Sequence, residues 1–384
     1  MDSLTQFRTN RKGRLIWFHC ASLGEFEQGR PIMEAIRRKN PDVLIALTFF
    51  SPSGYEVRKN YAGADWVGYL PNDTKSNNTK FIRILDPVAS VYVKYEYWPG
   101  YFFELKKRGI PLLMVSAILR PDQRFFGLFK GFWKKVLACV DHYFVQNEET
   151  AELLGTLGFG NFTIAGDNRF DRVIEIAGKS GEIDEISTAV NGSFTIVAGS
   201  TWQEDETMLI RWIEQTKQYR TDRTFKLILV PHETDSSHIG QIQRFTTSSV
   251  LWSERHQKDL KSYPIIIIDT IGMLSSIYRY ADVTYVGGGF GKGIHNTLEA
   301  AVWSKPLIFG PNIRKFEEAK NMVKLGGALV VNNYDDLKVA LDRYLADEDY
   351  TKRCGETNGK YVQSNAGATE IVMQHLERKA VFKN

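Results

Sequence analysis

Cysteine is scarce in this chain of 384 residues, and its three copies stand far apart. Cys20, Cys139 and Cys354 form no Cys-x-x-Cys pair and no Cys/His spacing of the kind that binds zinc. An odd and widely spaced set also excludes a small fold held by disulfides. We therefore expect a protein of a reducing compartment.

Long hydrophobic runs are also missing. No apolar stretch reaches the roughly 18–20 residues that a membrane-spanning helix requires. The chain starts with the polar segment MDSLTQFRTNRKGR, which lacks the apolar centre of a signal peptide. We expect the chain as given to be soluble, with no N-terminal membrane anchor.

A strong net charge is lacking as well, because 49 basic residues stand against 45 acidic ones. The net charge of +4 is too small to predict a nucleic-acid partner, and none is expected. The basic excess is local to residues 101–140. Within it, Arg120 to Lys135 mixes aromatic and basic residues, including Arg124. This composition fits a helix at an anionic membrane surface or an ordinary amphipathic helix packed on a sheet.

What the chain does contain is the composition of a globular protein, with 43% hydrophobic residues and a length that favours two domains. Short apolar runs alternate with amphipathic stretches, which is typical of parallel sheets covered by helices on both faces. The predicted strands are residues 15–20, 43–50, 66–70, one within 86–94, 111–116 and 142–145, then 195–198, 226–230, 265–268, 283–286 and 306–309.

The alternation occurs twice, which predicts an α/β protein of two similar halves. We place a first domain at residues 1–172, a polar linker at 173–193 and a second domain at 194–365. Residues 366–384 include a helical pattern that could pack back on the first domain.

In open parallel sheets, ligands bind beyond the carboxyl ends of the strands. After the first strand, Glu25 is a candidate general base, or else an acid that caps a helix. Ser51 to Gly54 forms a second small-residue loop beside that turn. Glu96 follows another strand among aromatic residues, where burial would raise its pKa. It could assist Glu25 or be a paired structural acid.

The turn from Gly287 to Asn296 is the most informative one in the second half, because it is rich in glycine directly after a strand. Its amides, Lys292 and the start of a helix predicted over 296–303 together indicate an anion site. Glu299 lies near Asn296 on the same helix face and could bind a ribose, or be an ordinary helix acid. The loop matches neither a Walker loop nor a dinucleotide fingerprint, so a dehydrogenase is disfavoured.

Three further turns of the second half carry polar residues after strands. Ser200 and Thr201 could bind phosphate or sugar, or cap a helix. His232 could contact phosphate or carboxylate, or lie in a surface loop. Pro311 and Asn312 could shape a base or ribose pocket, or form a plain turn.

Taken in order, these segments resemble the 3-deoxy-D-manno-octulosonic acid (Kdo) transferases of lipopolysaccharide biosynthesis. The resemblance extends from about Leu15 to Val372. The motifs that carry it are HCASLGE (19–25), SPSG (51–54), YEYWP (95–99), GDNRFD (166–171), AGST (198–201), the glycine-rich loop from Gly288 to Glu299, and FGPN (309–312).

This resemblance implies a GT-B fold, with two Rossmann-like domains whose parallel sheets face each other across a cleft. The first domain would bind the acceptor, a lipid A precursor, and the second the donor, CMP-Kdo. Glu25 would be the base of an inverting transfer, and the leaving phosphate would need no obligatory metal or other cofactor. No Asp-x-Asp pair follows a predicted strand, which agrees. The site would lie at the cytoplasmic face of the bacterial inner membrane, reached through Arg120 to Lys135.

The residue roles that follow are of three kinds. The catalytic pair is Glu25 and Glu96. The donor-binding set is Ser200, Thr201, His232, Gly288, Gly289, Gly291, Lys292, Gly293, His295, Asn296, Glu299, Pro311 and Asn312. The acceptor-binding set is Ser22, Gly24, Ser51, Ser53, Arg120, Arg124 and Arg169.

The chain departs from the family pattern in three places. Relatives usually start with a hydrophobic anchor. Many have Pro-Arg-His where this chain has Pro231-His232-Glu233, and some have lysine at the place of Arg169. Two alternatives stay open. One is a GT-B transferase or epimerase that uses a UDP-sugar, and the other is a non-catalytic module that binds anionic lipid.

Overall fold

A computed structural model of the chain describes residues 1–219, 223–246, 248–379 and 381–382. The chain divides into two compact units, each described by itself below. Unit 1 comprises Met1–Arg172 and Asn365–Asn384, and unit 2 comprises Val173–Ser364.

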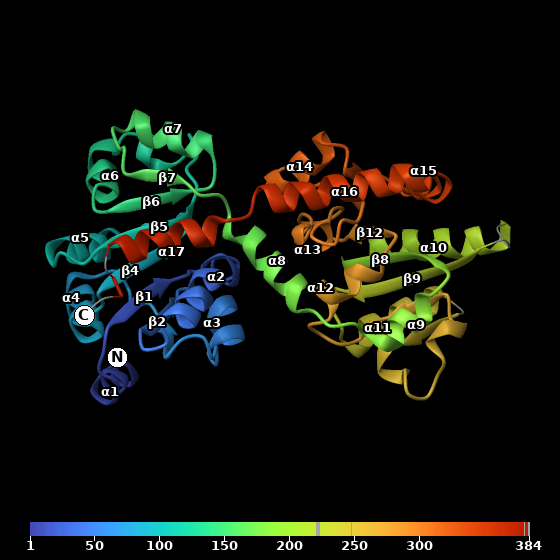
Figure 1. Ribbon diagram of the computed structural model, residues 1–384, viewed down its shortest axis with the longest axis horizontal. Helices are drawn as coiled ribbons and strands as arrows, with labels where there is room; N and C mark the ends of the chain where they lie inside the picture. The colour runs from blue at the N-terminus through green and yellow to red at the C-terminus, as the bar shows by residue number, and fades with distance from the viewer. Residues whose placement is uncertain (220–222, 247, 380, 383–384) are drawn as a thin grey trace. The chain divides into compact units, whose positions relative to one another are not determined.

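Unit 1 alternates strands and helices along the chain (Figure 1). Its elements are α1 (Asp2–Asn10), β1 (Leu15–His19), α2 (Leu23–Lys39), β2 (Leu44–Phe49), α3 (Pro52–Arg58), β3 (Trp66–Tyr69), α4 (Lys75–Leu85), β4 (Ala89–Val93), α5 (Pro99–Lys107), β5 (Leu112–Ala117), the 3-10 turn η1 (Arg124–Phe126), α6 (Lys130–Leu137), β6 (His142–Val145), α7 (Glu148–Thr156), β7 (Phe162–Ile164), the first residues of α8 (Asn168–Lys179), and α17 (Ala368–Arg378).

Unit 2 repeats the same alternation. After the rest of α8, its elements are α9 (Asp184–Val190), β8 (Ser193–Thr201), α10 (Gln203–Tyr219), β9 (Thr224–Pro231), α11 (Ser236–Phe245), β10 (Ser249–Leu251), η2 (Trp252–Glu254), η3 (Leu260–Ser262), β11 (Ile265–Ile267), α12 (Leu274–Ile277), η4 (Tyr278–Tyr280), β12 (Val283–Val286), α13 (Leu298–Ala301), β13 (Leu307–Phe309), α14 (Glu317–Lys324), β14 (Ala328–Val330), α15 (Tyr334–Ala346) and α16 (Glu348–Ser364).

Each unit contains one sheet of seven parallel strands, so the predicted α/β class is confirmed. The strand orders are β3-β2-β1-β4-β5-β6-β7 in unit 1 and β10-β11-β9-β8-β12-β13-β14 in unit 2. All eleven predicted strands are present. The sequence patterns miss β7, β10 and β14, which have three residues each and lie at sheet edges, where one flank lacks a buried neighbour.

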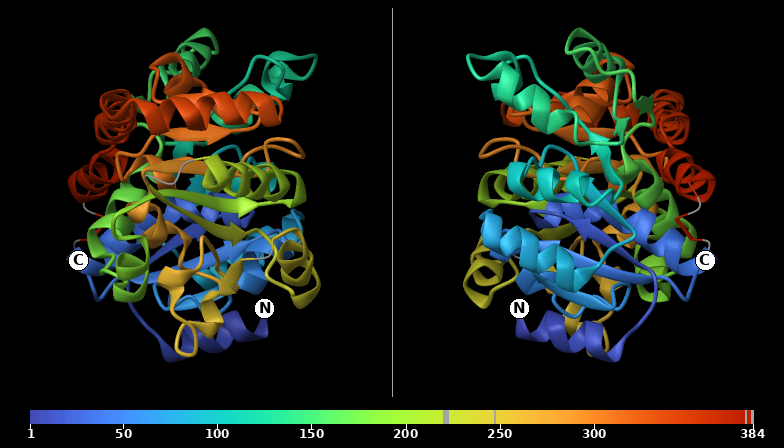
Figure 2. Two further views of the ribbon diagram at one scale, coloured as in Figure 1. Left: turned by 90° about the vertical axis from the view of Figure 1, so that its right-hand side faces the viewer. Right: turned by 90° about the vertical axis from the view of Figure 1, so that its left-hand side faces the viewer.

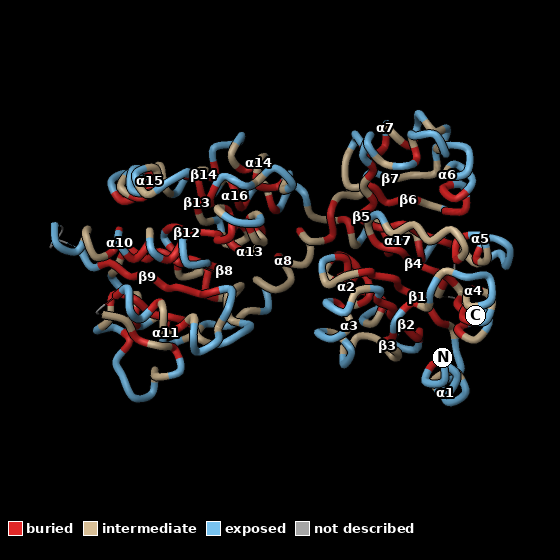
Figure 3. The backbone as a smooth tube through the Cα atoms, turned by 180° about the vertical axis from the view of Figure 1, so that it is seen from behind, coloured by how far each residue is buried: buried red, intermediate tan, exposed pale blue. Residues whose placement is uncertain are grey.

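The cores lie on both faces of each sheet. All residues of β1, β2, β4 and β5 are buried, which explains why their sequences read as unbroken apolar runs rather than alternating patterns. In Figure 3 the strands run red through the centre of each unit, while much of the helical surface is pale blue. The left view of Figure 2 shows helices above and below the strands of unit 2.

The last helix returns the chain to unit 1. Helix α17 packs on α2, and Val372, Met373 and Leu376 are fully buried in the same core cluster as the strands β1, β2 and β4. At its start, Asp171 accepts the backbone N–H groups of Gly367 and Thr369 at 2.6 and 2.7 Å. The segment 173–193, expected as a linker, is largely helical and belongs to unit 2.

The segment from Arg120 to Lys135 differs from the helix that its composition suggested. Its first part is irregular apart from η1, and the helix α6 starts only at Lys130. Phe125 is buried in the core of unit 1, whereas Leu128 is 99% exposed and Phe129 is 75% exposed. The aromatic residues therefore divide between the core and the surface.

In each sheet, the direction in which successive strands are added reverses at one place. In unit 1 the chain builds outward from β1 to β3 and then returns to the other side of β1 with β4, and in unit 2 it does the same at β8 and β12. Open α/β sheets bind ligands at such a switch point, beyond the carboxyl ends of the two strands.

Candidate functional site

At the switch point of unit 1, Glu25 lies in the first turn of α2 and is almost fully buried. One of its oxygens, Oε2, accepts the backbone N–H of Ser22 at 2.9 Å and the Ser22 hydroxyl. The bond from the Ser22 N–H is one half of a capping box, and the other half is the Glu25 backbone N–H that donates to the Ser22 side chain, so the helix-capping interpretation of Glu25 is correct. Both of these bonds use Oε2. Among the residues described, none makes a hydrogen bond to Oε1, so that oxygen is available to a ligand hydroxyl.

The second small-residue loop lies directly beside this turn. The backbone N–H groups of Phe50 and Ser51 both donate to the carbonyl of Ala21, at 3.2 and 2.7 Å. Ser51 is the N-cap of α3, and its hydroxyl contacts the Ser53 hydroxyl at 2.8 Å. The expected loop is therefore the start of a helix that presents two exposed hydroxyl groups next to Ser22.

Glu96 comes from the loop after β4, on the other side of the same switch point. Its Oε2 accepts the indole N–H of Trp98 at 3.0 Å. Burial raises the pKa of Glu96 above its ordinary value, and the charge of Glu25 raises it further. The same charge acts on the neighbouring Tyr95, whose pKa is raised chiefly by burial. The two acids thus belong to one electrostatic cluster.

The three predicted acceptor-binding arginines lie in different surroundings. Arg120 is exposed, and its charge acts to lower the pKa of Tyr95. Arg124 stacks over Trp133 at 5.9 Å. Arg169 donates to the buried carboxylate of Asp167 at 2.9 Å, so part of its charge is neutralised there.

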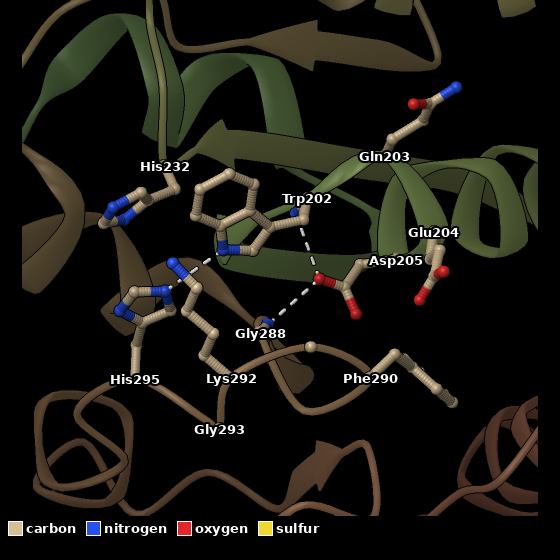
Figure 4. Close-up of a pocket in the computed structure, with 11 residues that line it drawn as sticks. Trp202, Gln203, Glu204, Asp205, His232, Gly288, Phe290, Lys292, Gly293 and His295 are labelled. Carbon is tan, nitrogen blue, oxygen red and sulfur yellow. Dashed lines mark hydrogen bonds between the residues drawn. The ribbon is translucent and has the colours of Figure 1, made fainter.

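The switch point of unit 2 contains a cavity of about 640 Å³. Figure 4 shows the side chains around it. They come from the loop after β8, from the loop after β9 and from the glycine-rich loop after β12. The lining residues are Trp202, Gln203, Glu204, Asp205, His232, Gly288, Phe290, Gly291, Lys292, Gly293 and His295.

Asp205 holds the glycine-rich loop in place. Its carboxylate accepts the backbone N–H of Gly288 at 3.1 Å, the backbone N–H of Trp202 at 3.0 Å and the hydroxyl of Tyr285 at 2.6 Å. Gly288 has a φ of +88°, a conformation that favours glycine. A side chain there would also strike the carbonyl of Gly293. Buried Asp205 therefore holds the glycine-rich loop against the start of α10.

Three aromatic rings form a stack along one wall of the cavity. The ring of His232 lies 4.8 Å from that of Trp202 and 4.4 Å from that of His295, both in stacked orientation. The indole N–H of Trp202 also donates to Nε2 of His295 at 3.3 Å. Figure 4 shows the Lys292 side chain running up beside this group. An ammonium, imidazole rings and a glycine-rich backbone suit a phosphate or carboxylate ligand.

Several predicted donor residues support this loop instead of lining the cavity. Thr201 is buried and donates to Glu206 at 2.9 Å. A Cβ on Gly289 would lie 2.6 Å from the backbone of Gly310, so the two loops touch there. Asn312 donates to the carbonyl of Gly291 at 2.8 Å. Ser200 and Pro311 lie beside these residues in the chain and outside the cavity lining.

The helix predicted over residues 296–303 is wrong in extent, because α13 spans only Leu298–Ala301. Four residues supply no appreciable helix dipole, so the anion site depends on Lys292, the imidazoles and the loop amides. Glu299 accepts bonds from Asn296 at 2.9 Å and from Ser275 at 2.7 Å, and it lies outside the cavity lining. The ribose-binding role suggested for it remains a prediction.

Sequence reasoning missed five lining residues, Trp202, Gln203, Glu204, Asp205 and Phe290. A signal was present for the first four, because they directly follow Ser200-Thr201 at the carboxyl end of a strand. Their identity as pocket residues depends on β8 and β12 being neighbours, which a sequence without strand order does not reveal.

Comparisons with known proteins agree with the motifs. A family model described as 3-deoxy-D-manno-octulosonic-acid transferase (kdotransferase) matches residues 2–172, which is the main part of unit 1. A 3-deoxy-D-manno-octulosonic acid transferase of Rickettsia felis is 26% identical over 374 residues, covering 95% of this chain and 79% of that protein. The chain is therefore similar to the Kdo transferases along most of its length. The resemblance inferred from its motifs is thereby confirmed.

A second relative extends the same match. The 3-deoxy-D-manno-octulosonic acid transferase of Aquifex aeolicus is 28% identical over 364 residues, covering 92% of this chain and 93% of that one. Since the family model stops at residue 172, these alignments are what carry the relationship into unit 2.

Solved structures confirm the fold class. UDP-GlcNAc 2-epimerase from Neisseria meningitidis bound to UDP-GlcNAc matches with a TM-score of 0.65 at 14% identity, covering 95% of this chain and all of that one. MurG of Acinetobacter baumannii matches with a TM-score of 0.58 at 11% identity, over 95% of this chain. At such identities only the fold is shared, and that fold is GT-B.

The sequence predicts no membrane-spanning helix. In the described part of the chain, no helix combines the length and the apolar character needed to cross a bilayer.

Proposed function

We propose that the protein transfers Kdo from CMP-Kdo to a hydroxyl group of a lipid A precursor. The observation that carries the proposal is the relationship to Kdo transferases over nine-tenths of the chain, together with a cavity suited to an anion at the unit 2 switch point. CMP-Kdo carries a phosphate and a carboxylate, and both are anions that Lys292 and the imidazole rings can bind.

Glu25 is the proposed general base. The cap to Ser22 fixes the carboxylate through Oε2 and leaves Oε1 to accept the proton of the attacking hydroxyl. That hydroxyl oxygen forms the new bond to the anomeric carbon of Kdo as the bond to the CMP phosphate breaks. Attack from the side opposite the leaving group inverts the carbon. Glu96, beside Glu25, would orient the acceptor or share the proton.

Departure of CMP needs charge stabilisation on the leaving phosphate. Lys292, His295 and the amides of the glycine-rich loop are the groups proposed to supply it, without an obligatory metal ion. Ser22, Ser51, Ser53 and Arg120 are proposed acceptor contacts.

We also propose that this activity takes place at the cytoplasmic face of the inner membrane. Leu128, Phe129 and Phe132 are exposed, Lys130 lies between them in the sequence and Lys134 follows them. Exposed apolar side chains next to lysines favour an anionic lipid surface.

The deciding experiment mixes the protein with CMP-Kdo and a tetraacylated lipid A precursor in detergent. We expect CMP release and a product heavier by one Kdo residue or more, unchanged in the presence of EDTA. Loss of transfer with EDTA and its return with a divalent ion would contradict the metal-free mechanism. Tight UDP binding with no CMP binding would contradict the donor and favour a UDP-sugar enzyme.

A further inference from the structure

The side chain of Trp202 makes a contact that fixes the protonation of its neighbour. An indole N–H can only donate a hydrogen bond. Since Trp202 Nε1 lies 3.3 Å from Nε2 of His295, that nitrogen must act as the acceptor and carry no proton. A neutral His295 in this position therefore has its proton on Nδ1.

The surroundings keep His295 neutral. Burial lowers its pKa to about 4, and the adjacent His232 contributes to the decrease. The charged residues that line the same cavity are Lys292, Glu204 and Asp205. The face of the ring is covered by His232, and its Nε2 edge lies close to Gly288.

The second ring nitrogen remains open. Within the described ranges, no hydrogen bond is made to Nδ1 of His295. This atom is not fully buried, so a ligand can reach it. Free histidine prefers its proton on Nε2. The site therefore holds the less common tautomer and leaves its N–H without a protein partner.

We infer that Trp202 is a positioning residue that fixes His295 as an Nδ1–H donor to an anionic oxygen of the ligand. This inference rests on the proposed function, because the anion is the phosphate or carboxylate of the CMP-sugar. A neutral imidazole N–H donates a hydrogen bond but does not surrender its proton near neutral pH. His295 thus binds the anion without altering its protonation.

The first test needs no substrate. In a nitrogen-15 NMR spectrum of the histidine side chains, the His295 signals are those absent from the His295→Gln variant. We expect the Nδ1–H tautomer in the wild type and a shift toward the Nε2–H form in Trp202→Phe, which keeps an aromatic ring but removes the donor. An Nε2–H tautomer in the wild type, or the same tautomer in both proteins, overturns the inference.

The second test measures binding of CMP and of inorganic phosphate by calorimetry between pH 4 and 8. Trp202→Phe should weaken CMP binding about 3- to 10-fold at pH 7, as expected for one hydrogen bond. It should also raise the pH at which His295 titrates, because Nε2 becomes free to take a proton. Below that pH, the variant should regain affinity, a step that the double variant with His295→Gln lacks.

Trp252→Phe is the matched control, since Trp252 lies in η2 outside the cavity lining. It should change neither the His295 tautomer nor CMP binding. Equal CMP affinity in Trp202→Phe and wild type, with the tautomer shifted, would overturn the donor role of Nδ1–H. If the wild type binds neither probe but shows the Nδ1–H tautomer, the proposed donor is wrong while the positioning by Trp202 stands.

Discussion

The two switch points share one topology and differ in chemistry. In unit 1, the loops after β1 and β4 carry two acids, Glu25 and Glu96, with serine hydroxyls beside them. In unit 2, the loop after β12 carries an ammonium, an imidazole and a run of glycines, and His232 from the loop after β9 adds a second imidazole. The equivalent position in the two sheets thus carries groups suited to proton removal in unit 1 and groups suited to anion binding in unit 2.

The difference also lies in how each switch point is held. Glu25 is fixed by a cap within its own first turn, so its position depends on one helix. The glycine-rich loop is fixed from outside by Asp205 on α10 and by contact with Gly310. Local chemistry positions the acid, whereas tertiary contacts position the anion site. Variants can separate these two kinds of support.

The largest expected effect follows from Glu25→Gln. The amide preserves shape but cannot accept a proton, so kcat should fall by about 100- to 10,000-fold, the usual range for a lost general base. CMP affinity should stay within twofold, because the cavity proposed to bind the donor is in unit 2. Product mass and calorimetry measure the two quantities.

Ser22→Ala tests whether Glu25 acts only as a cap. It removes the hydroxyl that bonds Glu25 and should cost about 0.5–2 kcal/mol of stability. If Ser22→Ala and Glu25→Gln lose the same activity and the same stability, Glu25 is structural and the comparison of the two switch points fails.

A smaller effect is expected for Lys292→Ala. Removing a charged donor to a phosphate costs about 1.5–3 kcal/mol, so the Kd for CMP should rise by about 10- to 100-fold. Lys324→Ala is the control, since Lys324 is an exposed residue at the end of α14. Equal Kd values for the two variants would place the anion elsewhere.

The contact between Gly289 and Gly310 can be tested through stability. Gly289→Ala places a Cβ 2.6 Å from backbone atoms of Gly310. The clash should cost about 1–3 kcal/mol and lower the thermal midpoint by several degrees. Gly240→Ala in α11 is the control, because nothing lies within 4 Å of its Cβ position. A Gly289→Ala midpoint no lower than that of the control would show that the loops do not touch.

The smallest effect concerns pH. Because burial and Glu25 raise the folded-state pKa of Glu96, the folded protein holds this proton more tightly than the unfolded chain. Its contribution therefore lowers stability as pH rises through and above the ordinary glutamate range. Glu96→Gln should stabilise the protein more at pH 7 than at pH 4, as measured by urea unfolding. A gain that is equal at both values would contradict the raised pKa.

Much of this architecture was predictable from sequence. Buried parallel strands such as residues 15–20 read as unbroken apolar runs, and the turns after them pointed to Glu25, Lys292 and His295. The edge strand β14 was missed although β13 is equally short, because β14 is only partly buried whereas β13 is fully buried. Helix α13 was overextended because the sequence from Asn296 onward is compatible with helix, while Asn296 and Thr297 lie outside it.

The wall of the unit 2 cavity shows a different limit of prediction from sequence. Trp202 reads as the start of a helix, and only its partner 93 residues away gives it a role beside His295. In the sequence, Asp205 is one of three acids in the run 204–206. Only the folded structure shows that it accepts the backbone N–H of Gly288. Contacts between loops of distant strands follow from strand order, and a single sequence does not contain that order in readable form.

The return of α17 to unit 1 has a consequence for synthesis of the chain. Unit 2 is an insertion within unit 1, because residues 173–364 separate the two parts of that unit. On the ribosome, unit 2 is therefore complete while unit 1 still lacks Val372, Met373 and Leu376 from its core. Unit 1 thus begins to emerge before unit 2 but completes its core after it. Until α17 has been synthesised, the part of the unit 1 core that α17 covers is exposed, and the nascent chain can associate with other chains through it.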